Sequence, residues 1–318
     1  MPNKHITTKN KIYDCFTFYN ELELLEVRLG ILDEVVDKFV LIESTVTYTN
    51  QPKPLYFKRN QKRFQKFKDK IIHVIVEDTP NVSNPWYIEH YLMAAAKRGL
   101  IHSKPNDTIL ISNLDEIPDP KKILEYKEKP GNLKAFEQRF FYYFLNLAST
   151  NHKWVGTKMI KYKNFKKYFD AYIIRHSYND VLIKNGGWHF SYMGGLQRIR
   201  DKIATGTHQE YNNNNYNTKE KILQSIIERK DAFNHGDKFG FIEIEELPIY
   251  IQNNRNKYSS MLLPEDKRSL FKKQHLFFLE LKHLARIFFR SLRAKPIKTG
   301  KQTKINQNAV PTMGVING

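Results

Sequence analysis

Short apolar runs alternate with amphipathic stretches in the first third of the chain. Four short runs are rich in Val, Ile, Leu and Phe, which is typical of buried strands. They cover residues 11–18, 38–43, 70–76 and 108–112. Leucines recur at helical spacing from Leu22 to Leu32, and an alanine run supports a helix over 86–100. Strands that alternate with helices predict an α/β fold with a Rossmann-type, doubly wound sheet flanked by helices.

The stretch 133–147 is dense in aromatic residues, and most of them are expected to pack in the core. Tyr142, Tyr143 and Asn146 are nevertheless candidates to line a ligand groove, because aromatic rings and amides can contact a ligand there. A further strand with a solvated basic face is expected around Trp154.

Composition narrows the class of protein. With 318 residues, of which 41% are hydrophobic, the chain can bury a sizeable core. Its single cysteine, Cys15, excludes an internal disulfide and a cysteine-based zinc site. Neither a signal peptide nor a transmembrane anchor is expected, so we predict a cytoplasmic protein.

The net charge of +19 is unevenly distributed. Residues 267–304 hold twelve Lys or Arg and one acid, so more than half of the excess lies in a C-terminal segment. We predict a main domain over 11–255, a helical extension over 256–294 and a disordered tail over 295–318. Within 270–293, apolar residues and arginines form neighbouring stripes of an amphipathic helix. This helix either docks on the main domain or binds an anionic membrane surface peripherally.

Acidic and amide side chains follow the fourth predicted strand. Asn113, Asp115 and Glu116 lie where the ligand crevice of an open α/β sheet is found. Such an acidic turn suits Mg²⁺ or Mn²⁺ and, through the metal, a diphosphate. The alternative is a turn that only caps the following helix, since Asp119 precedes it.

Polar residues also end the first two strands. Asn20 and Glu21 follow the first, and Glu43 ends the second, so three strands bring such side chains to one edge. This convergence favours a ligand site over a cap. A nucleic-acid-binding protein, or another binder of anionic surfaces without catalysis, is the alternative suggested by the basic charge. It leaves the acids unexplained, and no helix-turn-helix, zinc-finger or RNP pattern is present.

Two downstream motifs contain histidines. His189 follows paired glycines, which let a backbone approach a ligand closely, although a lone histidine is more often buried and hydrogen-bonded. His208 and Glu210 lie two residues apart near the expected crevice, and either could serve catalysis.

Five segments resemble glycosyltransferase family 17, which includes the β-1,4-mannosyl-glycoprotein β-1,4-N-acetylglucosaminyltransferases. They are YDCFTFYNELELLEVRLGIL, KFVLIESTVTYTNQPKPLYF, DTILISNLDEIPDP, GGWHFSYMGG and TGTHQEYN, in one order across residues 12–248. The resemblance implies a GT-A-like fold, a UDP-sugar donor such as UDP-GlcNAc, a glycan acceptor that is lipid-linked or protein-linked, a divalent metal and inversion at the anomeric carbon. A transferase of another nucleotide-activated hexose stays an alternative.

The resemblance also guides the choice of site residues. Asp115, Glu116 and His189 are the expected metal ligands, while Asn20, Glu21, Glu43 and Asn113 are expected to hold the donor. Glu210 is the expected base, with Glu116 and His208 as further catalytic candidates and Glu137 and Asp170 as alternatives to Glu210.

The chain departs from the family at two positions. The family usually has Asp-x-Asp-Glu at the acidic turn, whereas Asn113 here brings no charge. Met93 stands near a position where the family usually has Arg. Metal affinity or donor preference is therefore expected to differ.

Overall fold

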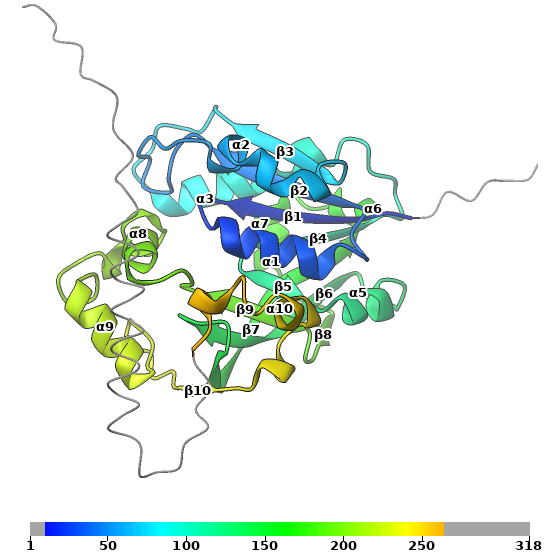
Figure 1. Ribbon diagram of the computed structural model, residues 1–318. Helices are drawn as coiled ribbons and strands as arrows, with labels where there is room; N and C mark the ends of the chain where they lie inside the picture. Colours follow the sequence, from blue (N-terminus) through cyan, green and yellow to red (C-terminus); the bar gives the residue numbers. More distant parts are fainter. Residues whose placement is uncertain (1–9, 264–318) are drawn as a thin grey trace, which may run out of the picture.

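The computed structural model describes residues 10–263, which fold around a mixed sheet of ten strands (Figure 1). The strands are β1 (Ile12–Phe18), β2 (Lys38–Ser44), β3 (Ile71–Val76), β4 (Thr108–Asn113), β5 (Glu116–Pro118), β6 (Leu133–Tyr142), β7 (Leu147–Lys161), β8 (Val181–Ile183), β9 (Gly187–Ser191) and β10 (Phe239–Phe241). Their main order is β3-β2-β1-β4-β7-β6-β9-β5, with β10 on β7 and β8 on β6.

Ten α-helices and four short 3₁₀ segments connect these strands within the described range. The α-helices are α1 (Leu22–Leu32), α2 (Tyr56–Arg59), α3 (Pro85–Ala94), α4 (Ala96–Gly99), α5 (Pro120–Tyr126), α6 (Tyr162–Phe165), α7 (Ala171–His176), α8 (Leu196–Thr205), α9 (Lys219–Glu228) and α10 (Ile249–Asn253). The 3₁₀ segments are η1 (Gln61–Phe67), η2 (Gln209–Tyr211), η3 (Ile244–Glu246) and η4 (Ser259–Met261). Within residues 10–263, no helix is both long and apolar enough to cross a membrane.

The parallel half of the sheet confirms the predicted α/β class. β3, β2, β1 and β4 are parallel neighbours, so the chain moves outward from β1 to β3 and then returns to the other side of β1. The point where the direction reverses lies between β1 and β4. Ligands bind in α/β sheets at the carboxyl ends of the strands beside such a point.

Alternate residues of the parallel strands enter separate cores on the two faces of the sheet. Phe39 and Leu41 of β2 join a core with α1 and α10, whereas Val40 and Ile42 join one with α3 and α7. This alternation follows from the two-residue repeat of a strand. Both faces of the parallel half are therefore covered by helices, as Figure 1 shows.

The second half of the sheet is largely antiparallel and supports α8 and α9. β7 pairs with β4 on one side and with β6 on the other. A third core joins Phe140 and Tyr142 of β6 to Ile199 of α8 and Ile222 of α9. Tyr142, Tyr143 and Asn146 are buried in or beside this core, so the prediction that they line an open groove is wrong.

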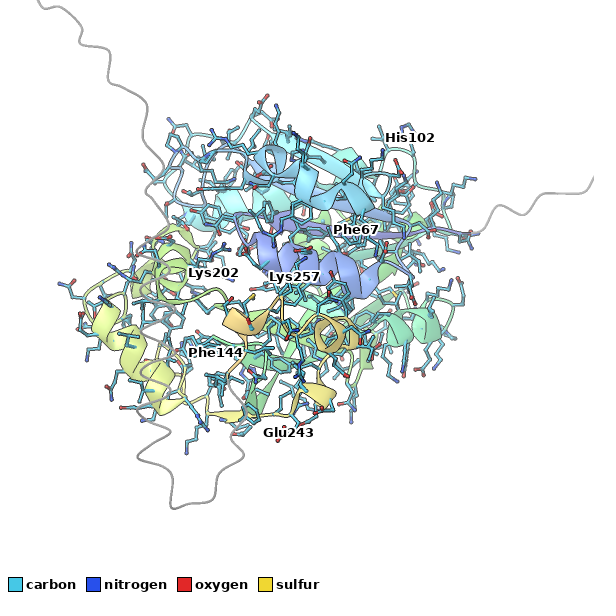
Figure 2. The ribbon with its side chains drawn as sticks, viewed as in Figure 1. Phe67, His102, Phe144, Lys202, Glu243 and Lys257 are labelled. Carbon is cyan, nitrogen blue, oxygen red and sulfur yellow. The ribbon has the colours of Figure 1, made fainter. Side chains whose placement is uncertain are left out.

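Two predicted boundaries change. The helix expected over 86–100 divides into α3 and α4 at Ala95. The packed region extends past residue 255, because Tyr258 and Met261 join the main core and Lys257 forms an ion pair with Glu26 of α1 (Figure 2). The predicted amphipathic helix at 270–293 and the predicted disordered tail at 295–318 lie outside the described residues.

Candidate active site

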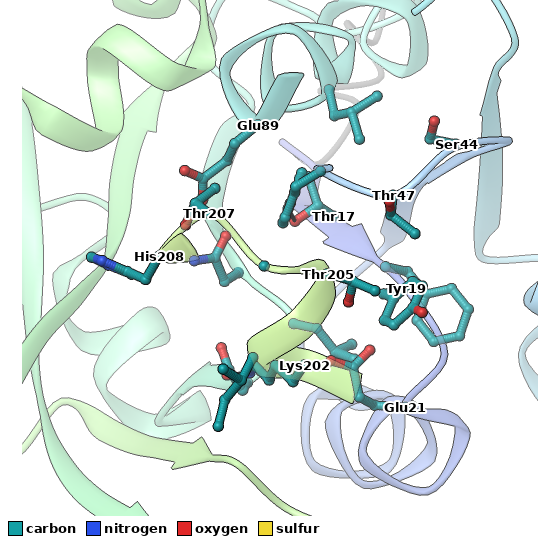
Figure 3. Close-up of a pocket in the computed structure, with 18 of the residues that line it drawn as sticks. Thr17, Tyr19, Glu21, Ser44, Thr47, Glu89, Lys202, Thr205, Thr207 and His208 are labelled. Carbon is teal, nitrogen blue, oxygen red and sulfur yellow. Dashed lines mark hydrogen bonds and ion pairs between the residues drawn. The ribbon is translucent and has the colours of Figure 1, made fainter. Parts of the chain in front are cut away.

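A pocket opens at the carboxyl ends of β1, β2 and β4, where the sheet topology predicts a ligand (Figure 3). It contains about 1000 Å³ of empty space when its open mouth is included. The strand ends contribute Tyr19, Glu21, Ser44, Thr47, Asn113 and Asp115, and the helices α3 and α8 contribute Glu89 and Lys202. The fold thus brings together polar residues from five separate parts of the sequence.

Arg28 holds the turn that carries Asp115 in place. This wholly buried residue of α1 pairs with Asp14 of β1 through two bonds, Nε to Oδ2 at 2.8 Å and Nη2 to Oδ1 at 2.6 Å. Its Nη1 donates to the carbonyls of Asn113, Leu114 and Glu116 at 2.8 to 3.0 Å. The guanidinium group therefore fixes three backbone carbonyls of the acidic turn, two before Asp115 and one after it.

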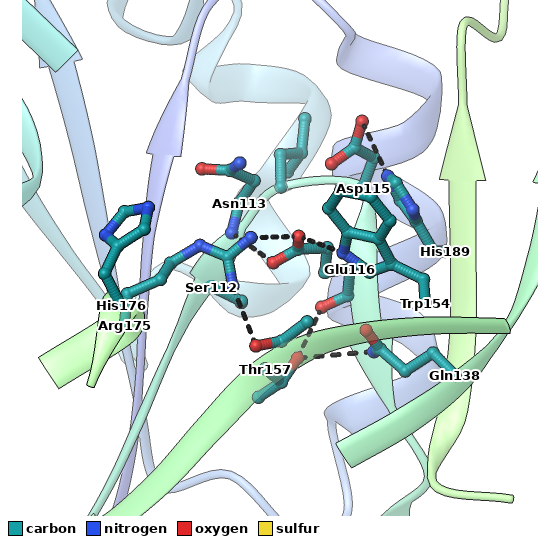
Figure 4. Close-up of polar contacts among 12 residues, drawn as sticks. Ser112, Asn113, Asp115, Glu116, Gln138, Trp154, Thr157, Arg175, His176 and His189 are labelled. Carbon is teal, nitrogen blue, oxygen red and sulfur yellow. Dashed lines mark hydrogen bonds and ion pairs between the residues drawn. The ribbon is translucent and has the colours of Figure 1, made fainter. Parts of the chain in front are cut away.

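Asp115 is the acidic residue of this turn that reaches the pocket. Its Oδ2 lies 2.7 Å from Nζ of Lys202. The same oxygen lies 3.7 Å from Nε2 of His189 (Figure 4). Burial opposes ionisation of the carboxyl, but the charges of Lys202 and His189 outweigh it and hold the pKa of Asp115 far below its usual range. The same pair raises the pKa of Lys202, despite its burial. The pocket therefore contains a permanent carboxylate and a permanent ammonium.

Glu116 has a different environment from its neighbour. Its carboxylate accepts hydrogen bonds from Nε1 of Trp154 at 2.7 Å and from the backbone N–H of Asn113 at 3.0 Å, and it forms an ion pair with Arg175. The side chain is fully buried and is absent from the pocket lining. The predictions that Glu116 binds a metal or acts in catalysis are therefore wrong, because its oxygens already stabilise the turn.

The remaining side chains fit a divalent cation with few protein ligands. Oδ1 of Asn113 and Nδ1 of His189 are buried without a hydrogen-bond partner, and Asp115 provides a carboxylate nearby. Across residues 10–263, no three or more His, Cys, Asp or Glu residues are grouped closely enough to hold a metal. Mg²⁺ commonly binds through one or two carboxylates together with waters and substrate phosphates, so this sparse set suits a cation that arrives with a diphosphate.

The paired glycines before His189 have a structural role. Gly187 adopts φ +140°, and a Cβ there would lie 2.2 Å from the carbonyl oxygen of Ile117. Because β9 pairs with β5 at this point, glycine allows close contact between the strands. The glycines thus place His189 opposite Glu116, instead of approaching a ligand as expected.

The residues predicted to hold the donor separate into two groups. Glu21 and Asn113 line the pocket, whereas Asn20 and Glu43 do not. Glu43 is fully buried, accepts the backbone N–H of Phe57 at 2.8 Å and lies 2.9 Å from Nε2 of His73. The prediction that Glu43 contacts a ligand is wrong, because its carboxylate caps the first turn of α2.

A basic and aromatic subsite lies near the end of β1. Lys53 lines the pocket with its Nζ buried and unpaired, 5.6 Å from the ring centroids of Tyr19 and Tyr56. Burial lowers the pKa of Lys53 to about 8, although the charges of Glu43 and Glu21 act in the opposite direction. A planar base or an anionic group would find both ring faces and a cation here.

His208 and Glu210 lie at the mouth of the pocket. His208 lines it and packs edge-on against Trp86 of α3, with 4.7 Å between ring centroids. Glu210 is exposed, contacts Nδ1 of His208 at 2.6 Å and is absent from the lining. The hydrogen bond from His208 lowers the pKa of Glu210. An exposed carboxylate with a lowered pKa is poorly suited to remove a proton from a substrate hydroxyl.

The two alternative bases also have other partners. Asp170 is buried, caps α7 by accepting the N–H of Ile173 at 3.0 Å and contacts His90 at 2.7 Å. Glu137 forms an ion pair with Lys153 beside a separate surface groove. The carboxylate that the sequence did not single out is Glu89 of α3, which lines the pocket.

Sequence comparison gives the family of the chain. The family model described as Glycosyltransferase family 17 matches residues 3–279. The chain belongs to this family. The acidic turn, the histidine of β9 and α8 all lie within the matched range.

Curated relatives match a shorter stretch. The β-1,4-mannosyl-glycoprotein 4-β-N-acetylglucosaminyltransferases of Rattus norvegicus and Homo sapiens are each 28% identical over 134 residues, which is 40% of this chain. The match spans 25% of the length of either relative. A solved structure, the mannosyltransferase PcManGT from Pyrobaculum calidifontis in complex with GDP-Man and Mn²⁺, covers 92% of this chain and 77% of its own. It shares 9% identity at a TM-score of 0.38, too distant for a comparison of the two sites.

Proposed function

We propose that this protein transfers N-acetylglucosamine from UDP-GlcNAc to a glycan acceptor, with inversion and with help from a divalent cation. The observation that carries the proposal is the pocket at the switch point of the sheet, which Asp115 and Lys202 line as an ion pair. His189 lies outside the lining, with its Nε2 3.7 Å from Oδ2 of Asp115. Family membership supports the reaction class. The names of the curated relatives support the donor and a mannose-containing acceptor.

The two ends of the pocket suit the two ends of a nucleotide sugar. Tyr19 and Lys53 provide rings and a cation for the base and ribose, and Thr47 adds a hydroxyl. Lys202 and Asp115 line the same cavity as an ion pair and would face the diphosphate. Lys202 offers an ammonium to phosphate oxygens whenever Asp115 is engaged elsewhere.

Asp115, His189 and the amide oxygen of Asn113 would hold the cation. Bound there, Mn²⁺ or Mg²⁺ would stabilise the negative charge that develops on the departing diphosphate. The side chains of the chain itself orient the donor and keep the leaving group beside Lys202. Inversion requires a single displacement, so a base on the acceptor side must remove one hydroxyl proton.

A donor panel tests this proposal directly. The protein is incubated with UDP-GlcNAc, UDP-glucose, UDP-galactose and GDP-mannose, with and without Mn²⁺, and released nucleoside diphosphate is measured. We expect release from UDP-GlcNAc that increases with Mn²⁺. Release from another UDP-hexose alone would keep the reaction and change the donor, whereas no release from any sugar would contradict the proposed function.

Asn113→Asp is expected to tighten Mn²⁺ binding. A second carboxylate beside Asp115 adds attraction for a divalent ion of about 1 to 2 kcal/mol after desolvation, or roughly 5- to 30-fold in Kd. Calorimetric titration of the free protein with MnCl₂ measures this without turnover. Asn113→Ala is the matched control, which should bind Mn²⁺ no more tightly than the native protein. Weaker binding by Asn113→Asp would remove this side chain from the cation site.

A further inference from the structure

Three carboxylates line the pocket among the described residues, and they differ in their partners. Asp115 is paired with Lys202, and Glu21 accepts the backbone N–H of Asn20 at 3.1 Å. Glu89 lines the pocket, and within residues 10–263 its carboxylate makes no hydrogen bond or ion pair. A half-buried carboxylate without a partner is costly to keep unless it serves a ligand.

The position of Glu89 places it away from the nucleotide subsite. In Figure 3 it lies beside Thr207 and His208, on the opposite side of the pocket from Tyr19 and Glu21. It is one helical turn from Trp86, which is 40% exposed and packs against His208 at the mouth. An acceptor that enters past Trp86 would therefore meet Glu89 before it reaches the donor end.

From this geometry we infer that Glu89 is the catalytic base of the transfer, an assignment that rests on the proposed function. In the step, an acceptor hydroxyl oxygen bonds to the anomeric carbon of the donor. The bond from that carbon to the diphosphate oxygen breaks, and its electron pair leaves with the diphosphate. The hydroxyl proton passes to a Glu89 carboxylate oxygen and later to solvent, so atoms and charge balance.

The electrostatic surroundings support this role. Burial raises the pKa of Glu89 to about 6, with the negative charges of Glu116 and Asp115 adding to the rise. Arg175 and His208 oppose it. A carboxylate of this basicity is ionised near neutral pH and accepts a proton more readily than an exposed glutamate does. Glu210, whose pKa is lowered, is the weaker base of the two.

Glu89→Gln tests the assignment, because it preserves shape and removes the proton acceptor. We expect UDP release from UDP-GlcNAc with p-nitrophenyl β-mannoside as acceptor to fall roughly 100- to 10,000-fold, the usual contribution of a general base. UDP-GlcNAc binding, measured by calorimetry, should stay within about twofold, since binding does not need this proton transfer. Glu89→Asp keeps a carboxylate on a shorter stem and should fall between the native protein and Glu89→Gln.

Glu210→Gln is the matched comparison, with the same chemical change on the exposed carboxylate. It should alter UDP release by less than about threefold. The inference is wrong if Glu89→Gln stays within threefold of the native rate, if it loses donor binding together with turnover, or if Glu210→Gln carries the large loss instead. Failure of the proposed function is distinct, because the native protein itself would then release no UDP.

Discussion

Asp115→Asn should reduce donor turnover by about 100- to 1,000-fold and leave the fold intact. The change preserves the shape of the side chain and removes the charge that faces Lys202 and His189. Removal of one preorganised electrostatic group commonly costs a reaction about 3 to 4 kcal/mol. UDP release from UDP-GlcNAc under saturating MnCl₂ measures the loss, and urea unfolding checks the fold.

Mn²⁺ titration separates the two possible origins of that loss. If Asp115 is a ligand, the variant should bind Mn²⁺ at least tenfold more weakly, because an amide oxygen offers no charge to the ion. If Asp115 only holds Lys202, then Mn²⁺ affinity should persist while turnover falls. Native turnover with native Mn²⁺ dependence in Asp115→Asn would contradict both roles of this carboxylate.

The first four strands were predictable because each is an apolar run, and β1, β2 and β4 are buried on both faces. The observed bounds agree with the predicted ones to within a residue or two, for example β2 at Lys38–Ser44 against 38–43. The convergence of polar residues at one edge followed from the parallel arrangement alone. The sequence alone thus predicts a ligand site at the carboxyl end of β4.

The direction of each acidic side chain was harder to predict. Asp115 and Glu116 are adjacent, and successive side chains at the start of a strand point to opposite sides. Asp115 faces the pocket. Glu116 is bound by Trp154 and Arg175, which lie 38 and 59 positions away in sequence. The two acids look equivalent in the sequence, because the partners that distinguish Glu116 come from β7 and α7, far along the chain.

The residues that sequence reasoning missed share another feature. Both lie on helices: Lys202 is on the amphipathic helix α8 and Glu89 is on the largely apolar helix α3, and a charged residue on a helix usually indicates a solvated face. Their function depends on which side of the helix faces the sheet edge. The available signals were weak: Lys202 precedes the THQE motif by a few positions, and Glu89 is the only acid of α3.

Arg28→Met should destabilise the protein and loosen the acidic turn together. The substitution leaves the carboxylate of Asp14 buried at 0% exposure without its partner, which is expected to cost about 3 to 5 kcal/mol in the free energy of unfolding. The carbonyls of Asn113, Leu114 and Glu116 also lose their common donor. Urea unfolding at 25 °C measures the first effect.

The double variant Asp14→Leu with Arg28→Met separates stability from positioning. Replacing both members of a buried ion pair by apolar residues is often close to neutral, so this protein should regain most of the lost stability. It still lacks the guanidinium that fixes the turn, and we therefore expect Mn²⁺ affinity to stay at least threefold weaker than in the native protein. Native Mn²⁺ affinity in a stable double variant would show that the turn holds its geometry without Arg28, through the bonds of Glu116 alone.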